Sequence, residues 1–255
     1  MEAKGCEDLY EHVQADIIYI VKNIPGPGVD LEEFESEFSS GCMCDQMCVE
    51  NCSCTRFSIN YVNDCILDEK ISGPVVECND HCKCRNNCGN RLVQYGPLDC
   101  LVVSQTELKG YGLKTMKIIK KGQFICEYAG EVIGIEEAKC RIETNKRGKS
   151  MNYVLTVSEH LIHRTIKTYI DPKFFGNIGR YCNHSCEPNA TLVPVRIEGI
   201  VPRLCLFASS DIGEGEEITF NYAGEEANSV HNLSDTPCLC GSSNCVRYLP
   251  HHPIM

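Results

Sequence analysis

The sequence lacks any hydrophobic run long enough to cross a membrane. Its longest apolar runs have only five residues, as in Ile17–Val21, whereas a membrane-spanning helix needs about 20. The opening residues, Met1 to Glu7, have neither the basic nor the apolar region of a secretory signal peptide. We therefore expect a soluble intracellular protein with no membrane partner.

The sequence also lacks an excess of positive charge. Lys and Arg number 24 against 35 Asp and Glu, which gives a formal net charge of −11. An acidic surface repels phosphates, so we expect no direct, sequence-specific binding of nucleic acid. A Lys- and Arg-rich peptide is a better partner for this charge, although the same acidity would also serve solubility alone.

Cysteine, in contrast, is abundant, with 20 residues in the chain. Between Cys42 and Cys88 hydrophobic periodicity is almost absent, so ordinary packing could not hold the segment together. Cysteines separated by one residue suit ligands that converge on a metal better than partners in a disulfide. A disulfide scaffold of a secreted protein is the alternative. The short spacings join nine cysteines: Cys42, Cys44, Cys48, Cys52, Cys54, Cys78, Cys82, Cys84 and Cys88.

Nine thiolates fit three zinc ions. Each tetrahedral ion needs four sulfurs, and the twelve bonds are supplied if six sulfurs bind once and three bridge two ions. A closed shell of thiolates leaves no position for water or substrate, so this predicts a structural site. Cys65 has no closely spaced neighbour and is interpreted, like the other isolated cysteines, as a free thiol.

The pattern changes from about Leu101 to Tyr222. Short β-rich runs at 101–103, 153–157, 191–193 and 204–207 alternate with Gly, Pro and Asn, and one helix is expected from Ile135 to about Asn145. The sequence therefore predicts a mainly β fold with short helices. We divide the chain into an N-terminal lead (1–41), a cysteine-rich module (42–95), a central domain (96–224), a polar linker (225–237) and a second cysteine cluster (238–255).

Four short motifs occur in order in and around this central region. Singly, each has an ordinary structural interpretation as a turn, a polar corner or the rim of a core. Together, between two cysteine clusters, they resemble the pre-SET, SET and post-SET array of histone lysine methyltransferases. The motifs are Lys109-Gly110-Tyr111-Gly112-Leu113, Glu127-Tyr128-Ala129-Gly130-Glu131-Val132, the run from Arg180 to Asn189, and Glu217-Ile218-Thr219-Phe220-Asn221-Tyr222.

The resemblance implies a SET fold, which consists of small curved β-sheets with a pseudoknot that brings Asn183 beside Tyr222. Residues 42–95 would form the three-zinc pre-SET module, 96–224 the SET domain and 238–255 the post-SET segment. It also implies a fourth zinc ion, which would fold the C-terminal tail over the cofactor. The ligands of that ion would be Cys186, Cys238, Cys240 and Cys245.

The resemblance further implies that the chain uses S-adenosylmethionine to methylate lysine. Tyr222 would be the main catalytic residue, in an aromatic channel with Tyr128, Tyr153 and Phe220. Phe220 stands where a Tyr favours fewer methyl groups, so a di- or trimethylated product is expected. The cofactor would be bound by Lys109, Gly110, Tyr111, Gly112, Tyr153, Arg180, Asn183 and His184.

The expected substrate is a lysine of the histone H3 tail, presented as a peptide or in a nucleosome, and the expected location is nuclear chromatin. The family modifies both the ninth and the thirty-sixth residue of H3, and the sequence does not choose between them. A non-catalytic histone-tail module is the first alternative and a zinc-dependent nucleic-acid binder the second. Two departures from the family pattern, Cys182 and Asn221, leave their effects open.

Overall fold

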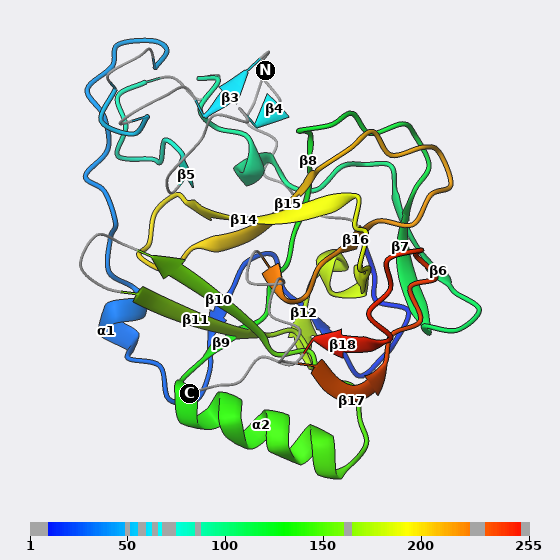
Figure 1. Ribbon diagram of the computed structural model, residues 1–255. Helices are drawn as coiled ribbons and strands as arrows, with labels where there is room; N and C mark the ends of the chain where they lie inside the picture. Colours follow the sequence, from blue (N-terminus) through cyan, green and yellow to red (C-terminus); the bar gives the residue numbers. More distant parts are fainter. Residues whose placement is uncertain are drawn as a thin grey trace.

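The computed structural model describes residues 10–48, 52–55, 60–62, 66–67, 75–84, 88–160, 165–224 and 233–250. Their fold is mainly β, as the sequence predicted (Figure 1). The helices are α1 (Leu31–Phe34), α2 (Ile135–Arg147) and the 3-10 helices η1 (Val93–Tyr95) and η2 (Ile178–Tyr181). The strands are β1 (Ile18–Tyr19), β2 (Ile24–Pro25), β3 (Tyr61–Val62), β4 (Ile66–Leu67), β5 (Val75–Val76), β6 (Leu101–Gln105), β7 (Tyr111–Thr115), β8 (Phe124–Glu127), β9 (Glu131–Ile133), β10 (Leu155–His160), β11 (Thr165–Asp171), β12 (Phe175–Gly176), β13 (Asn183–His184), β14 (Ala190–Arg196), β15 (Arg203–Ala208), β16 (Thr219–Phe220), β17 (Leu233–Pro237) and β18 (Tyr248–Pro250).

Two small sheets form the centre of the molecule. Their strand orders are β10-β11-β9-β2 and β5-β14-β15-β8. The largest core cluster draws on both sheets and includes Ile125, Ile170 and Leu206, each 0% exposed. In Figure 1 the cysteine-rich segment around β3 and β5 lies at one end of the molecule and α2 at the other, with these sheets between them. Burial of apolar side chains therefore stabilises the centre. The sulfurs of the cysteine-rich end form a separate cluster, which β5 connects to the central sheet.

Helix α2 confirms the helix expected at 135–145. It carries Glu136 and Glu137 in its first turn and Lys146 and Arg147 in its last, which suits the helix dipole. Ala138 is buried on the face toward the sheet. No described helix has both the length and the apolar character needed to cross a bilayer.

The N-terminal lead pairs with strands of the central domain. Strand β1 pairs in parallel with β12, and β2 pairs in parallel with β9. Helix α1 is capped by the Asp30 side chain and has no buried residues, so its acidic side chains Glu32 and Glu33 are exposed to solvent. The described part of the lead thus adds strands to both the central sheet and the segment before η2.

The C-terminal segment forms a hairpin of β17 and β18. Strand β17 occupies residues 233–237, the end of the stretch assigned to a linker, while residues 225–232 of that stretch lie outside the described residues. Cys6 and Cys65 also lie outside them. Of the other isolated cysteines, Cys100, Cys126, Cys182 and Cys205 are buried thiols and Cys140 is an exposed one.

Candidate functional site

Two segments far apart in sequence meet at the site. Strand β13 pairs in parallel with β16, with Asn183 opposite Thr219 and His184 opposite Phe220. The backbone N–H of Ser185 donates to the Phe220 carbonyl at 3.1 Å, which extends this pairing. Because β14 and β15 come between the two strands in sequence, the local spacing of residues could not reveal the pairing. It places the motif that begins at Arg180 beside the motif that ends at Tyr222.

Three aromatic rings form a continuous cluster at this junction. The ring centroids of Phe220 and Tyr222 lie 4.9 Å apart, and those of Tyr128 and Phe220 lie 5.9 Å apart. Phe220 is 1% exposed and Tyr128 5%. The Tyr128 hydroxyl donates to the Tyr153 carbonyl at 2.9 Å, which joins the fourth aromatic residue to the cluster. The four residues expected around the aromatic channel are thus brought together.

Tyr222 is held at both ends. Its backbone N–H donates to Nδ1 of His184 at 3.2 Å, and its hydroxyl donates to the Cys182 carbonyl at 3.0 Å. Burial, with smaller contributions from Cys182 and Tyr153, raises the pKa of the Tyr222 hydroxyl far above its ordinary value. The phenol therefore stays protonated at neutral pH and acts as a hydrogen-bond donor, not as a base.

Glycines allow the chain to pass close to the Asn183 side chain. A Cβ atom added at Gly112 would lie 2.7 Å from Glu217 and 3.1 Å from the Asn183 amide nitrogen. Gly110 has a φ of +73°, and the space beside it is open. The Asn183 amide donates to the Tyr111 carbonyl at 3.0 Å. Only a glycine fits at residue 112 without displacing these side chains.

Glu217 was not assigned a role from the sequence, although it lies inside a recognised motif. Its carboxylate accepts from Lys109 Nζ at 2.5 Å and from the Asn183 amide at 2.8 Å. It therefore links three of the four motifs. Both Lys109 and Glu217 are about four-fifths buried, at 20% and 21% side-chain exposure, so the pair is shielded from most solvent.

Arg180 offers a buried cation beside this region. Its guanidinium carbon lies 4.8 Å from the ring centres of both Tyr153 and Tyr181, and the residue is 6% exposed. It donates to the Pro172 carbonyl at 3.0 Å and to the side-chain oxygen of Gln14 at 3.1 Å. Gln14 belongs to the N-terminal lead, for which the sequence predicted no role in the site. A fixed guanidinium between aromatic rings suits binding of a carboxylate.

The nine closely spaced cysteines between residues 42 and 88, which exclude Cys65, pack into one cluster of sulfurs. Distances between Sγ atoms are 3.5 Å for Cys42–Cys48, 3.3 Å for Cys48–Cys78 and 3.6 Å for Cys54–Cys82. These distances are too long for a disulfide. They are close to the sulfur–sulfur distance of about 3.8 Å expected when four thiolates form a tetrahedron around zinc. The donor set therefore fits zinc.

Three groups of four sulfurs lie within 4.8 Å of one another in this cluster. Cys42 belongs to all three groups, and Cys48 and Cys78 belong to two each, so sulfurs must bridge if each group holds an ion. Cys88 belongs to none of the three groups. Burial and neighbouring sulfurs raise the pKa of the Cys44 thiol to about 11 and that of Cys84 to about 12. Burial therefore disfavours ionisation of these two thiols, and a bound cation would offset that cost.

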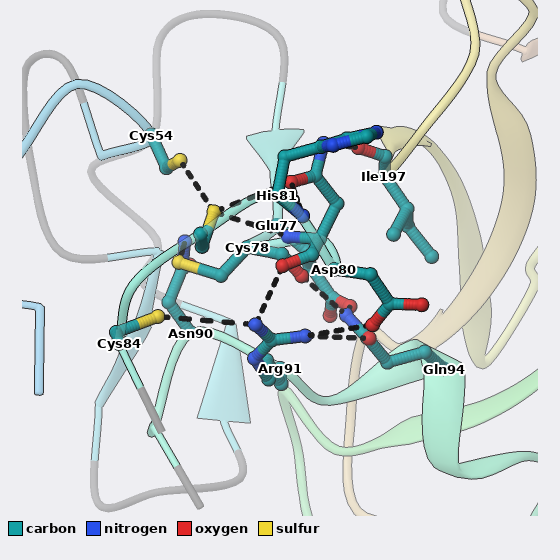
Figure 2. A network of polar contacts seen from close by, with 12 residues as sticks. Cys54, Glu77, Cys78, Asp80, His81, Cys84, Asn90, Arg91, Gln94 and Ile197 are labelled. Carbon is teal, nitrogen blue, oxygen red and sulfur yellow. Dashed lines mark hydrogen bonds and ion pairs between the residues drawn. The ribbon is translucent and has the colours of Figure 1, made fainter. Parts of the chain in front are cut away.

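Polar side chains surround these sulfurs (Figure 2). Arg91, 5% exposed, donates to the Asn79 carbonyl at 2.6 Å and approaches the Cys84 sulfur at 3.9 Å. Burial acts to lower the pKa of Arg91, but Cys84 and its neighbours raise it above the ordinary value. The Asn90 amide donates to the Cys78 sulfur at 3.4 Å. These donors favour a cluster whose sulfurs are anionic.

A separate group of four sulfurs lies beside β13, outside the pre-SET cluster, and its sulfurs are within 4.8 Å of one another. The Cys186 and Cys238 sulfurs are 3.8 Å apart, the spacing of a zinc tetrahedron. Cys186 also lies 3.4 Å from Nε2 of His184. The structure thus joins the cysteine after Asn183-His184 to the C-terminal tail, as the resemblance implied. The members are Cys186, Cys238, Cys240 and Cys245.

The two departures from the family pattern have local structural roles. The Cys182 thiol donates to the Ile218 carbonyl at 3.2 Å and is 1% exposed. The Asn221 side-chain oxygen accepts from the Ala223 N–H at 2.9 Å, which fixes the turn that follows β16. An Asp could accept the same bond, so the turn itself does not require Asn at this position.

Comparison with known proteins gives two family matches. The model of the SET domain matches residues 110–223, and that of the Pre-SET motif matches residues 5–91. Histone-lysine N-methyltransferase SETMAR of Rattus norvegicus is 41% identical over 250 residues, which cover 91% of this chain and 79% of the relative.

Solved structures agree with these matches. The methyltransferase domain of human Histone-lysine N-methyltransferase SETMAR superposes with a TM-score of 0.85 and 37% identity, covering 98% of this chain and 97% of that one. A structure of KRYPTONITE in complex with mCHH DNA, H3(1-15) peptide and SAH has a TM-score of 0.69 and 27% identity. That match covers 92% of this chain and 48% of KRYPTONITE.

Proposed function

Because the chain belongs to the SET-domain family of histone-lysine N-methyltransferases, which use S-adenosylmethionine, we propose that it methylates a lysine of the histone H3 tail to the di- or trimethylated state. The observation that carries this proposal is the aromatic cluster of Tyr128, Phe220 and Tyr222 beside the Asn183-His184 segment. The H3(1-15) peptide in the KRYPTONITE structure and the net charge of −11 support a basic histone tail as substrate.

We propose that residues from three motifs bind the cofactor, whose sulfonium supplies the methyl group. Arg180, Asn183 and His184 would hold the carboxylate and the adenine of the cofactor, and the adenine would be held partly through main-chain groups. Lys109 and the segment Gly110-Tyr111-Gly112 would lie along its methionine end, where the open space beside Gly110 permits close approach. Tyr153 would lie beside the methyl group.

The chain must deliver the lysine as a neutral amine. At pH 7.5 deprotonating a free lysine, with a pKa of about 10.4, costs about 4 kcal/mol. Burial among the rings of Tyr128, Phe220 and Tyr222 disfavours the charged ammonium and so lowers the pKa of the amine. The two tyrosines stay protonated because burial raises their pKa, so we propose that the proton leaves to water.

Orientation supplies most of the catalysis in this proposal. Holding an amine in line with the bond that breaks can lower a barrier by roughly 7 to 11 kcal/mol. Tyr222 can do so because hydrogen bonds fix both its backbone and its hydroxyl. The aromatic faces around it would stabilise the cationic product.

We also propose that four zinc ions hold the modules together, three bound by the nine pre-SET cysteines and one by the four cysteines beside β13. The domain boundaries proposed are 42–95 for pre-SET, 96–224 for SET and 238–255 for post-SET. Because histones are chromatin proteins, we propose that the protein is located in the nucleus and associates with chromatin. We propose no sequence-specific contact with DNA, because the chain is acidic. The KRYPTONITE structure does contain DNA, but this chain matches only 48% of the KRYPTONITE chain.

Labelled S-adenosylmethionine tests the proposed substrate. The protein should label H3 among purified core histones, and it should label one of two unmodified tail peptides, centred on the ninth or the thirty-sixth residue. Replacing the target lysine with Arg serves as the control, and should abolish labelling. Transfer to another histone with none to H3 would refute the proposed substrate.

Phe220 sets the expected number of methyl groups. Its ring is buried between Tyr128 and Tyr222, where an added hydroxyl would crowd a methylated amine. The wild-type protein should give di- or trimethyl-lysine, and Phe220→Tyr should shift the product toward monomethyl-lysine. Mass spectrometry of the peptide measures this, with Phe174→Tyr, at a half-exposed position, as the matched control. Monomethyl-lysine as the only wild-type product would contradict the assignment.

A further inference from the structure

We propose that His184 is a positioning residue that couples the post-SET zinc site to Tyr222. This inference rests on the proposed zinc site at Cys186 and on the proposed catalytic role of Tyr222. It goes beyond them by assigning the zinc site an effect on alignment of the catalytic tyrosine, in addition to folding the C-terminal tail.

The imidazole of His184 touches both groups. Nδ1 accepts the backbone N–H of Tyr222 at 3.2 Å, and Nε2 lies 3.4 Å from the Cys186 sulfur. A backbone N–H can only donate, so Nδ1 must be the bare nitrogen of the ring. The proton of the neutral ring is then on Nε2, where it points to the sulfur.

Zinc strengthens the second of these contacts. Cysteine binds zinc as a thiolate, and an anionic sulfur accepts a hydrogen bond more strongly than a thiol. With zinc bound, His184 would therefore donate a hydrogen bond to one of the sulfurs that hold the ion. Partners of this kind orient the ligand, and their loss typically weakens metal binding about 10- to 100-fold.

The surroundings make His184 a rigid link. The residue is 5% exposed, its ring centroid lies 5.3 Å from that of Tyr222, and its backbone pairs with Phe220 in the β13–β16 ladder. The Tyr222 hydroxyl is bound to the carbonyl of Cys182, two residues before His184. Hydrogen bonds thus attach both ends of Tyr222 to residues 182–184. Two residues further along the chain, Cys186 belongs to the group of four sulfurs beside β13.

Two substitutions separate the two bonds. In His184→Asn the short amide can reach the position of Nδ1 and accept from Tyr222, but it cannot reach Cys186. In His184→Gln the longer amide can donate to the Cys186 sulfur but leaves the Tyr222 N–H without its acceptor. Each variant of the full chain is first compared with wild type for its melting temperature.

Zinc affinity and kinetics are then measured separately. Native mass spectrometry during chelator competition reports loss of the most weakly held zinc ion. His184→Asn should lose one ion at a free-zinc concentration 10- to 100-fold higher than wild type. His184→Gln should hold zinc within about 2-fold of wild type, yet show a kcat at least about 10-fold lower, with a KM for the histone peptide within about 2-fold of wild type. Unchanged zinc affinity in the first variant, or unchanged kcat in the second, overturns the proposal.

A third variant keeps the test decisive if either substitution prevents folding. Cys245→Ser removes a sulfur ligand that is remote in sequence from Tyr222. With ¹⁵N-labelled tyrosine, its Tyr222 amide should show a shifted resonance and at least about 10-fold faster hydrogen exchange than in wild type. An unchanged Tyr222 amide overturns the coupling. This readout and the zinc affinity need no turnover, so an inactive wild-type protein would refute the proposed function without deciding the role of His184.

Discussion

Tyr222→Phe is expected to lower kcat by about 100-fold, which corresponds to about 2.7 kcal/mol of transition-state stabilisation. The variant removes one hydroxyl and keeps the ring that packs 4.9 Å from Phe220. Without its bond to the Cys182 carbonyl, the side chain loses the anchor that fixes its position at the reacting atoms. Steady-state kinetics on the H3 peptide give the change in kcat, and calorimetry with S-adenosylhomocysteine should give wild-type affinity.

Tyr248→Phe is the matched control. Tyr248 is 47% exposed on β18 and outside the aromatic cluster, so the same loss of a hydroxyl should leave kcat within about 2-fold of wild type. Wild-type turnover in Tyr222→Phe would refute a catalytic role for this hydroxyl. A loss of cofactor affinity in place of turnover would make the residue part of the cofactor site.

Removing zinc is expected to have the largest effect on stability. The described cysteine-rich segment packs on itself mainly through sulfurs, so it has little apolar core to keep it folded. Binding of structural zinc can contribute roughly 10 to 16 kcal/mol to a small domain. Chelator treatment should therefore lower the melting temperature by about 10 °C or more and abolish methyl transfer.

The control for that treatment is the same chelator already saturated with zinc, which should change neither the melting temperature nor the activity. Adding zinc back under reducing conditions should restore part of both. A protein that keeps its melting temperature and its turnover after full removal of metal would contradict a structural role for the ions.

Much of the central fold could be predicted from local sequence. The helix at Ile135–Arg147 has acidic residues at its start and basic residues at its end, and the strands β14 and β15 are long enough to carry a β-rich pattern. The convergence of Cys186 with the C-terminal cysteines was implied only by resemblance, because the spacing of about 50 residues between them contains no local signal.

The role of the N-terminal lead could not be predicted. Strands β1 and β2 have two residues each, too few to show the alternation that identifies a strand. Gln14 carries no motif, and its contact with Arg180 depends on how β1 docks beside β12. Strand β17 was missed for a similar reason, because most of its residues are polar and read as a linker.

The link between Tyr222 and His184 also depends on the tertiary fold. The parallel pairing of β13 with β16 sets it, and parallel strands separated by two others in sequence leave no pattern in the residues between them. The motif around Asn183 and the motif ending at Tyr222 could each be identified, but their register could only come from the structure.

Elemental analysis of the purified protein, prepared under reducing conditions, tests whether thirteen thiolates bind zinc and so fold the pre-SET module and the post-SET segment around the cofactor pocket. We predict four zinc atoms per chain in the wild-type protein and three in Cys245→Ser. A wild-type content near zero or one would contradict it.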